Sequence, residues 1–402
     1  MKQIPWSSLS ARSCRNRRKG CNFAWEQCKL GDVAKITMGQ SPNSKNYTDN
    51  PKDHILVQGN ADMKDGQVHP RIWTTEITKI ADKGDLILSV RAPVGDIGKT
   101  SYDVVIGRGV AAIKGNEFIF QLLKRMKTVG YWTKYSTGST FESINSLEIN
   151  NAVINLPKEH EQNKVGKILS YMDHAITLHE EKKRQLERLK SALLKKMFAD
   201  KSGYPAVRFE GFGGKWDQCK LGNVGTFRGG FGFPENEQGN IDGIAFYKVS
   251  DMNDSCNTLT MRKASNYVTS SQISKNKWKP ILNQNIIFAK VGAAVYLERK
   301  RKAMGPFLLD NNMMAFQPKD ADIDYIYYVF QRLRISKHAQ VGTLPSLNAS
   351  ELRNITIYIP SLNEQKAVAD LMVSLDHTII LYDFKLELLK KLKSSLLQHM
   401  FI

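Results

Sequence analysis

Two short segments have residue types that could do chemistry, but their spacing does not fit the motifs that they suggest. Gly95-Asp-Ile-Gly98-Lys99-Thr100 ends like a phosphate-binding loop, yet the residue five positions before Gly98 is Pro93 and not the required glycine. Asn50-Pro51-Lys52 is half of the Asn-Pro-Pro-aromatic motif of amino-methyltransferases. The eight histidines and five cysteines are scattered, without HExxH or zinc-ligand spacing. The sequence therefore favours a binding protein over an enzyme, and predicts no catalytic residues and no metal site.

The chain carries a large excess of positive charge, with 58 Lys and Arg against 39 Asp and Glu and a net charge of +19 over 402 residues. Because cations placed near phosphates release condensed counterions, this excess favours a polyanionic partner. Nucleic acid is favoured over a membrane surface, since no basic amphipathic helix has Trp or Phe on its apolar face. No apolar run approaches the roughly 20 residues of a membrane span. Scattered cysteines and the lack of a signal-peptide pattern predict a cytoplasmic protein.

Polar and basic residues in expected loops are the candidates for contact with DNA. Arg reads guanine and Asn reads adenine through bidentate contacts, whereas Lys more often holds phosphate. For any single residue a solvated surface charge is the alternative interpretation. The candidates are Lys45, Asn46, Arg71, Arg91, Arg108 and Lys134 in the first half of the chain, and Lys263, Asn266, Lys275, Lys277, Lys290, Arg299 and Arg301 in the second half.

An internal repeat sets the frame in which these residues are placed. Residues 156–200 and 359–402 match without a gap at an offset of 203, which pairs Pro157 with Pro360. Upstream, WEQCKLG (residues 25–31) matches WDQCKLG (residues 216–222). Each half thus has constant borders around a variable body of roughly 120 residues, a normal domain size. The pattern indicates two modules doing the same job on different targets; the alternative is an old duplication whose interiors drifted.

The two closely matching segments are predicted to form helices of about 40 residues, or roughly 60 Å. Apolar residues recur in steps of three and four, as in a coiled coil, although His179, Lys183 and Lys190 interrupt the first seam. Ser361 and Glu364 form the pattern of a capping box. Chain order then predicts an antiparallel pair with a pseudo-two-fold axis. The alternative is that each helix folds back onto its own domain.

Within the variable bodies, strands are expected at 85–90, 151–156, 245–249, 285–290 and 354–359, and helices at 118–128 and 325–335. The predicted fold class is α+β, with two mixed α/β domains joined by two long antiparallel coiled-coil helices. The predicted segments are a divergent lead-in at 1–24, a domain at 25–155, a helix at 156–200, a domain at 201–358 and a helix at 359–402.

This arrangement resembles the specificity subunit of type I restriction-modification systems. The elements that carry the resemblance are the Trp-x-x-x-x-Leu-Gly openings, the paired Pro-x-x-x-Glu-Gln helix starts and the segment RAPVGDIG (residues 91–98). The resemblance implies that each body is a target recognition domain reading half of a bipartite double-stranded DNA site. It also implies a bacterial, nucleoid-associated protein that binds no cofactor itself. Residues 1–24 depart from the family pattern.

The resemblance further implies that the helices set the spacer and dock two methyltransferase subunits, which carry S-adenosylmethionine and methylate adenine at N6. Up to two restriction subunits, with ATP and Mg, would complete the complex. The helix positions implied in docking and spacing are Glu161, Gln162, Leu169, Met172, Ile176, Leu186, Leu193, Glu364, Gln365, Met372, Leu375, Ile379, Leu389 and Leu396. The alternatives are a stand-alone DNA-modifying or DNA-cleaving enzyme and a coiled-coil scaffold.

Overall fold

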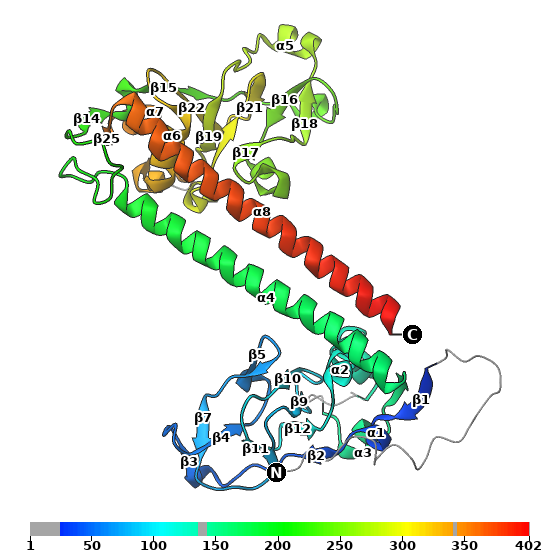
Figure 1. Ribbon diagram of the computed structural model, residues 1–402. Helices are drawn as coiled ribbons and strands as arrows, with labels where there is room; N and C mark the ends of the chain where they lie inside the picture. Colours follow the sequence, from blue (N-terminus) through cyan, green and yellow to red (C-terminus); the bar gives the residue numbers. More distant parts are fainter. Residues whose placement is uncertain (1–24, 136–142, 341–343, 402) are drawn as a thin grey trace. The chain divides into compact units, whose positions relative to one another are not determined.

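The structure is a computed structural model that describes residues 25–135, 143–340 and 344–401. The chain divides into two compact units, one made of residues 1–180 and 384–402 (unit 1) and one of residues 181–383 (unit 2). Figure 1 labels the elements of both units. The division falls in the middle of both long helices, whereas the sequence boundaries treat each helix as a separate segment. The predicted divergent lead-in, 1–24, lies outside the described residues.

Unit 1 contains a six-stranded sheet, in the order β2-β12-β9-β10-β6-β5, and a five-stranded sheet, in the order β3-β7-β4-β11-β8. A further pair, β1 and β13, is antiparallel. The strands are β1 Glu26–Lys29, β2 Ile36–Met38, β3 Tyr47–Thr48, β4 His54–Val57, β5 Met63–Lys64, β6 Gln67–Val68, β7 Ile72–Thr74, β8 Ile80–Ala81, β9 Leu86–Ser89, β10 Ile97–Lys99, β11 Val104–Ile106, β12 Val110–Ile113 and β13 Val153–Leu156, and the shorter helices are α1 Leu30–Val33, α2 Glu117–Thr128 and α3 Ser146–Asn150.

Unit 2 repeats this plan with a five-stranded sheet, β15-β22-β19-β20-β17, a three-stranded sheet, β18-β16-β21, and the two-stranded pairs β14-β25 and β23-β24. Its strands are β14 Asp217–Lys220, β15 Gly225–Gly229, β16 Ile244–Tyr247, β17 Thr260–Met261, β18 Asn266–Val268, β19 Asn285–Ala289, β20 Lys300–Ala303, β21 Phe307–Leu309, β22 Met313–Pro318, β23 Ala339–Gln340, β24 Ser346–Leu347 and β25 Thr356–Ile359, and its shorter helices are α5 Ser270–Asn276, α6 Ile323–Arg332 and α7 Ala349–Arg353.

The central strand of each unit is buried on both faces because its side chains alternate between two cores. In β9, Leu86 and Leu88 pack with α2, whereas Ile87 packs with residues of the second sheet. In β19, Ile286 and Phe288 pack with α6, and Ile287 packs in the core on the other face. The predicted strands and helices are confirmed, but α6 ends at Arg332, short of the expected Ile335, because Leu333 is extended.

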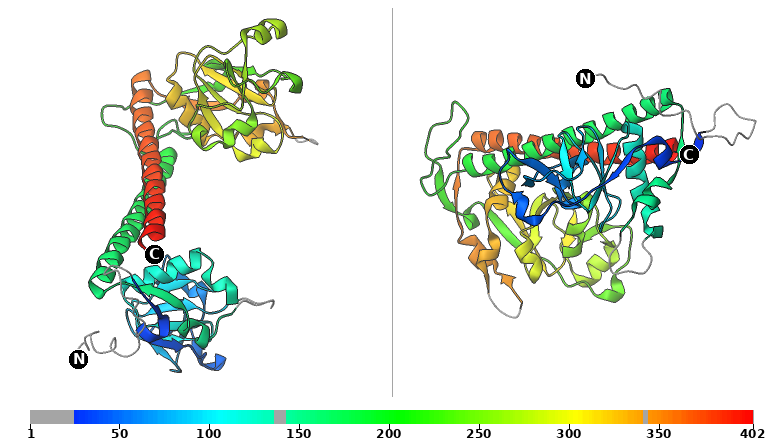
Figure 2. Two further views of the ribbon diagram at one scale, coloured as in Figure 1. Left: turned by 90° about the vertical axis from the view of Figure 1, so that its right-hand side faces the viewer. Right: turned by 90° about the horizontal axis from the view of Figure 1, so that it is seen from below.

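Two long helices, α4 (Glu159–Lys196) and α8 (Leu362–Met400), carry the repeat. Each unit contains one half of each helix, and the halves are antiparallel. In unit 2, Lys183 Nζ lies 2.6 Å from Asp383, and in unit 1, Lys390 Nζ lies 2.6 Å from Glu180. The two halves lie side by side within each unit in both views of Figure 2. The predicted antiparallel pairing is therefore confirmed, and the alternative of helices folded back alone on their own domains is wrong.

The repeated Met-Phe pair at the helix ends explains how each helix joins the other half of the sequence. Phe198, just after α4, is buried in the core of unit 2 and stacks on Tyr325 at 5.3 Å. Phe401, just after α8, is buried in the core of unit 1, 5.0 Å from the ring of Phe118 and 6.0 Å from that of Trp25. Each unit is thus completed by the last turn of a helix that begins in the other half.

The repeated Trp and Glu-Gln residues form the joint between each domain and its own helix. Trp25 Nε1 donates to Glu161 at 3.1 Å, and Trp216 Nε1 donates to Glu364 at 3.3 Å. Glu364 is buried and accepts two further bonds from the Arg208 guanidinium, at 2.7 and 2.8 Å. The capping-box prediction is therefore only half correct. The Glu364 backbone N–H lies 3.5 Å from the Ser361 hydroxyl, but the Glu364 carboxylate binds Arg208 and Trp216 instead.

Candidate nucleic-acid interface

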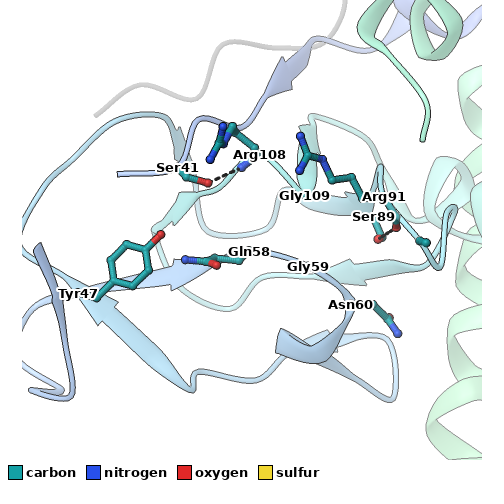
Figure 3. Close-up of a pocket in the computed structure, with 10 residues that line it drawn as sticks. Ser41, Tyr47, Gln58, Gly59, Asn60, Ser89, Arg91, Arg108 and Gly109 are labelled. Carbon is teal, nitrogen blue, oxygen red and sulfur yellow. Dashed lines mark hydrogen bonds between the residues drawn. The ribbon is translucent and has the colours of Figure 1, made fainter. Parts of the chain in front are cut away.

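Two of the predicted DNA-contacting residues, Arg91 and Arg108, meet at a polar hollow of about 310 Å³ in unit 1. Arg91 lies just beyond the end of β9, and Arg108 lies in the turn between β11 and β12. Both side chains are exposed. Within the described ranges, neither guanidinium forms a hydrogen bond or an ion pair. Figure 3 shows both arginine side chains at this hollow, together with Ser41, Tyr47 and Gln58.

Backbone contacts fix the positions from which these side chains extend. The Arg108 backbone N–H donates to the Ser41 hydroxyl at 3.0 Å, and the Ser89 hydroxyl donates to the Arg91 carbonyl at 3.0 Å. Gly109 allows a close approach of the turn to β4, because a Cβ there would lie 1.9 Å from the Gln58 carbonyl oxygen. The turn that carries Arg108 is therefore held directly beside Gln58.

Gln58 is the feature of the hollow that the sequence did not reveal. Its backbone N–H donates to Asp62 at 2.8 Å, which orders the chain after β4. Its side-chain Nε2 is buried, and no hydrogen-bond partner for it exists in the part of the chain that the structure describes. A buried donor without a partner costs about 1–3 kcal/mol, so an acceptor brought by a ligand would be favoured here. In Figure 3, the side chains of Gln58 and Tyr47 point toward one another.

The other candidates in unit 1 differ in their freedom to contact DNA. Lys45 is exposed in a short 3₁₀ helix, and Lys134 lies with its Nζ 3.6 Å from the centre of the Tyr131 ring. Asn46 donates its amide to Glu76 at 2.7 Å, and Arg71 donates to the Ala61 carbonyl at 2.9 Å. Asn46 is thus engaged in holding its own loop, which contradicts its prediction as a free adenine-reading amide in this conformation.

Several candidates in unit 2 are likewise bound within the protein. Asn266 is buried at the start of β18 and accepts from Gly239 at 3.2 Å, so its amide is engaged within the domain. Arg301 donates to the Asn257 carbonyl at 2.6 Å, and burial lowers the pKa of its guanidinium. The remaining cations are nearer the surface: Lys263 and Lys275 lie beside Asp254 and Glu237, Arg299 donates to Asn253, Lys277 ends α5 in a left-handed conformation and Lys290 follows β19.

Matching backbone contacts relate the hollow of unit 1 to positions in unit 2. The backbone N–H of Val90 donates to the Gly109 carbonyl, and the Val90 carbonyl accepts from the N–H of Ile144. In the same way, the N–H of Lys290 donates to the Asn312 carbonyl, and the Lys290 carbonyl accepts from the N–H of Leu347. Lys290 is therefore equivalent to Val90. Arg91 and Val291 each form an isolated bridge to the repeated serine, Ser143 or Ser346. This register agrees with the expected strands 85–90 and 285–290, and it makes Val291 the equivalent of Arg91.

The same registers identify the equivalents of the two other residues at the hollow. Parallel pairing joins Val57 to Ile106 in unit 1 and Tyr247 to Leu309 in unit 2, so Gln58 is equivalent to Lys248. The turns after Ile106 and Leu309 are closed by equivalent backbone bonds, in which the N–H of Val110 donates to Gly107 and the N–H of Met313 donates to Asp310. Arg108 is therefore equivalent to Asn311. Gln58, Arg91 and Arg108 in unit 1 thus correspond to Lys248, Val291 and Asn311 in unit 2.

The predicted docking residues on the helices fall into two groups. Gln162, Glu364 and Gln365 are buried: the two glutamine amides donate at 2.9 Å to the carbonyls of Pro157 and Pro360. They join the helices to their domains, so they are not available for partner contact. Leu169, Met372 and Leu375 are buried core residues. Glu161 is exposed, and the other positions, Met172, Ile176, Leu186, Leu193, Ile379, Leu389 and Leu396, are partly buried.

Two lysines in the helical repeat form interhelical ion pairs with the repeated aspartates. In unit 1, Lys393 of α8 binds Asp173 of α4, and in unit 2, Lys190 of α4 binds Asp376 of α8. Burial raises the pKa of Asp173, but Lys124, Lys393 and Gln121 lower it by more, so its pKa lies below the ordinary value. Lys190, which interrupts the predicted apolar seam, is therefore an ion-pair residue that fixes the register of the two helices in unit 2.

Across 25–135, 143–340 and 344–401, no group of three or more His, Cys, Asp or Glu is placed to hold a metal ion. Over the same stretches, no helix has the length and apolarity needed to cross a membrane.

A comparison with known proteins finds the same family domain in both halves of the chain. Residues 22–188 and 213–391 match the family described as type I restriction modification DNA specificity domain. One relative is the Methanocaldococcus jannaschii protein assigned as the specificity subunit of the MjaX type I restriction enzyme. The two sequences are 32% identical over an alignment that covers 44% of this chain and 43% of that protein. The MjaIX specificity subunit of the same organism is 22% identical over 93% of this chain and 91% of its own length.

Solved structures show the same fold. A crystal structure of the S subunit of a type I restriction-modification system from M. genitalium has a TM-score of 0.62 at 15% identity, over 96% of this chain and 98% of that one. A chain from a study of complex assembly in the type I R-M system has a TM-score of 0.52 at 16% identity, over 93% and 97%. Because both copies of the family domain are matched, the chain belongs to the type I restriction-modification DNA specificity family.

Proposed function

We propose that this chain selects the DNA site for a type I restriction-modification assembly and catalyses no reaction itself, with each unit reading one half of a bipartite site. The observation that carries the proposal is the pair of equivalent domains whose backbone frames match and whose residues at equivalent positions differ. The net charge of +19 supports a duplex partner. The alternative of a stand-alone DNA-modifying enzyme has no support in the family match.

A domain exchange tests the two-reader arrangement. Residues 224–345 are replaced by the corresponding body of a relative, which leaves Trp216, α4 and α8 unchanged. Sites are then selected from a randomised duplex library, or read from methylation in cells that contain the partner subunits. We expect one half-site to change and the other to remain. A change in both half-sites, or in neither, contradicts two separate readers.

The proposal includes two methyltransferase subunits, docked on the long helices, that carry S-adenosylmethionine and methylate adenine at N6. Exposed leucines recur at the repeat offset of 203, as Leu178 with Leu381 and Leu189 with Leu392. Unit 1 holds Leu178 and Leu392, and unit 2 holds Leu381 and Leu189. Each unit therefore presents the same pair of exposed apolar side chains, which suits two copies of one partner. Restriction subunits with ATP and Mg complete the proposed complex, in a bacterial cytoplasm.

Charge substitution tests this docking. We expect Leu178→Glu with Leu392→Glu to reduce the methyltransferase subunits that copurify from two to one, as counted by native mass spectrometry. Leu282→Glu is the matched control, because Leu282 is an exposed leucine on a loop before β19. Unchanged stoichiometry in the double variant, with the fold intact, rules out these leucines as the dock.

The helices are also proposed to set the spacer between half-sites. Deletion of Lys183–Leu189 together with Leu386–Leu392 removes one heptad at equivalent positions and keeps both Asp–Lys pairs. It shortens each helix by roughly 10.5 Å. We expect the spacer selected from a library of spacer lengths to decrease by up to about three base pairs. A folded, DNA-binding variant that keeps the original spacer contradicts this role.

A further inference from the structure

We infer that the hollow at Gln58, Arg91 and Arg108 is the base-reading centre of unit 1, and that its ligand is the major-groove edge of a purine. This inference rests on the proposed function and assigns residues to it. Arg presents two donors that match O6 and N7 of guanine, and a Gln carboxamide matches N6 and N7 of adenine. The hollow places both kinds of reader together.

The first argument is the availability of the donors. In the described part of unit 1, the guanidinium of Arg71 is already bound to a carbonyl, whereas the guanidiniums of Arg91 and Arg108 are exposed at the rim of the hollow. Gln58 adds a buried donor without a partner. These three side chains come from three different elements, which the backbone contacts of Ser41, Ser89 and Gly109 hold in place. Such fixed positions are what base discrimination requires.

The second argument separates a base edge from a phosphate, which also offers acceptors. Phosphates are the same in every sequence, so two units that use these positions to grip the backbone have no reason to differ in charge there. Instead, Arg91 is replaced by Val291, and Arg108 by Asn311, at equivalent backbone positions. Asn311 is exposed in its turn and is an adenine-reading type, whereas Arg108 is a guanine-reading type. The difference at equivalent positions fits two heads that read different bases.

The third argument concerns the groups that surround Gln58 and its equivalent in unit 2. In unit 2 the residue equivalent to Gln58 is Lys248, whose Nζ binds Gln238 and lies 5.8 Å from the centre of the Phe233 ring. In unit 1, the groups near Gln58 in Figure 3 are Tyr47 and Ser41, both with hydroxyls. The hollow of unit 1 therefore offers donors and hydroxyls to a polar edge, and none of the described residues that line it is acidic.

The test uses the full-length chain and a randomised duplex DNA library. We expect Arg108→Ala, Arg91→Ala and Gln58→Ala each to relax preference at one or two base pairs of a single half-site, and to weaken binding of the preferred sequence about 5- to 150-fold. Arg108→Lys keeps the charge but loses the planar fork, so it should retain non-specific binding and lose discrimination. Lys83→Ala is the matched control, because Lys83 is an exposed cation of the same unit that does not line the hollow, and it should leave the preference unchanged.

The outcomes separate the inference from the proposed function. If the wild-type chain selects no bipartite sequence, the proposed function fails. If the wild-type chain selects one and all three alanine variants keep it, the hollow is not the reading centre. A uniform loss of affinity for every sequence, with a shallower salt dependence, identifies phosphate contacts and also overturns base reading. Thermal unfolding of each variant verifies that the exposed substitutions leave the fold intact.

Discussion

Unit 1 and unit 2 share a backbone plan but not the residues at its most exposed turns. In both units, a strand buried on both faces ends beside a turn that joins two strands of different sheets, and the same backbone bonds hold the strand end and the turn together. The turn in unit 1 carries Arg108 and Gly109, and that in unit 2 carries Asn311 and Asn312. The comparison teaches that the frame fixes where a side chain is presented, while the residue type at that point is free to vary.

The largest loss of stability is expected from truncating the equivalent phenylalanines just after the two long helices. Phe401→Ala should destabilise unit 1, and Phe198→Ala unit 2, each by about 4 kcal/mol, because both rings are fully buried. Hydrogen exchange in peptides from β9 and β19 distinguishes the two units. Leu282→Ala serves as the exposed control. Faster exchange in β19 alone after Phe401→Ala would contradict the assignment of each helix end to a unit.

Loss of the glutamate that binds the repeated Trp should destabilise the two units by different amounts. Glu364 is buried and binds both Arg208 and Trp216, so Glu364→Ala should cost about 3 kcal/mol because it leaves Arg208 without its carboxylate partner. Glu161 is exposed and accepts a bond from Trp25, so Glu161→Ala should cost less than about 1 kcal/mol. Urea unfolding of the two variants, followed through each unit, measures the difference. Equal costs would show that burial of Glu364 is unimportant.

Loss of the interhelical ion pair should also cost the two units different amounts of stability, but the difference should be smaller. Lys190→Met leaves the carboxylate of Asp376 buried, with the Tyr328 hydroxyl at 2.7 Å as its remaining partner, and should cost about 2 kcal/mol. Lys393→Met leaves Asp173 with Lys124 at 3.2 Å, so it should cost about 1 kcal/mol. Thermal unfolding compares the two variants, and a larger loss for Lys393→Met would reverse the ranking.

The smallest expected effect is the contribution of Asp173 to the acid sensitivity of unit 1. Because the pKa of Asp173 is lowered in the folded state, its ion pairs stabilise unit 1 above the unfolded pKa, and this stabilisation is lost as the pH falls through the folded pKa. Hydrogen exchange of unit 1 between about pH 5 and pH 2 should therefore accelerate less in Asp173→Asn than in the wild-type chain. The same acceleration in both proteins would show that Asp173 does not contribute.

Much of the fold could be predicted because its signals are local or repeated. Apolar periodicity predicts α4 and α8, and a short apolar run predicts β9 and β19. The site was harder. Arg91 and Arg108 were predicted as exposed cations in loops, but nothing local distinguishes them from Arg301, which binds a backbone carbonyl. Gln58 was missed because a single glutamine after a strand carries no signal until the turn at Gly109 lies against it.

The sequence by itself determined the duplication, the two bodies, the long helices, the charge excess and the family, because these depend on composition, spacing and periodicity along the chain. Only the tertiary structure decided which half of each helix belongs to which unit, and which cations stay free. It also decided that Gln58, Arg91 and Arg108 meet at one hollow. The physical reason is that these properties depend on contacts between residues far apart in sequence.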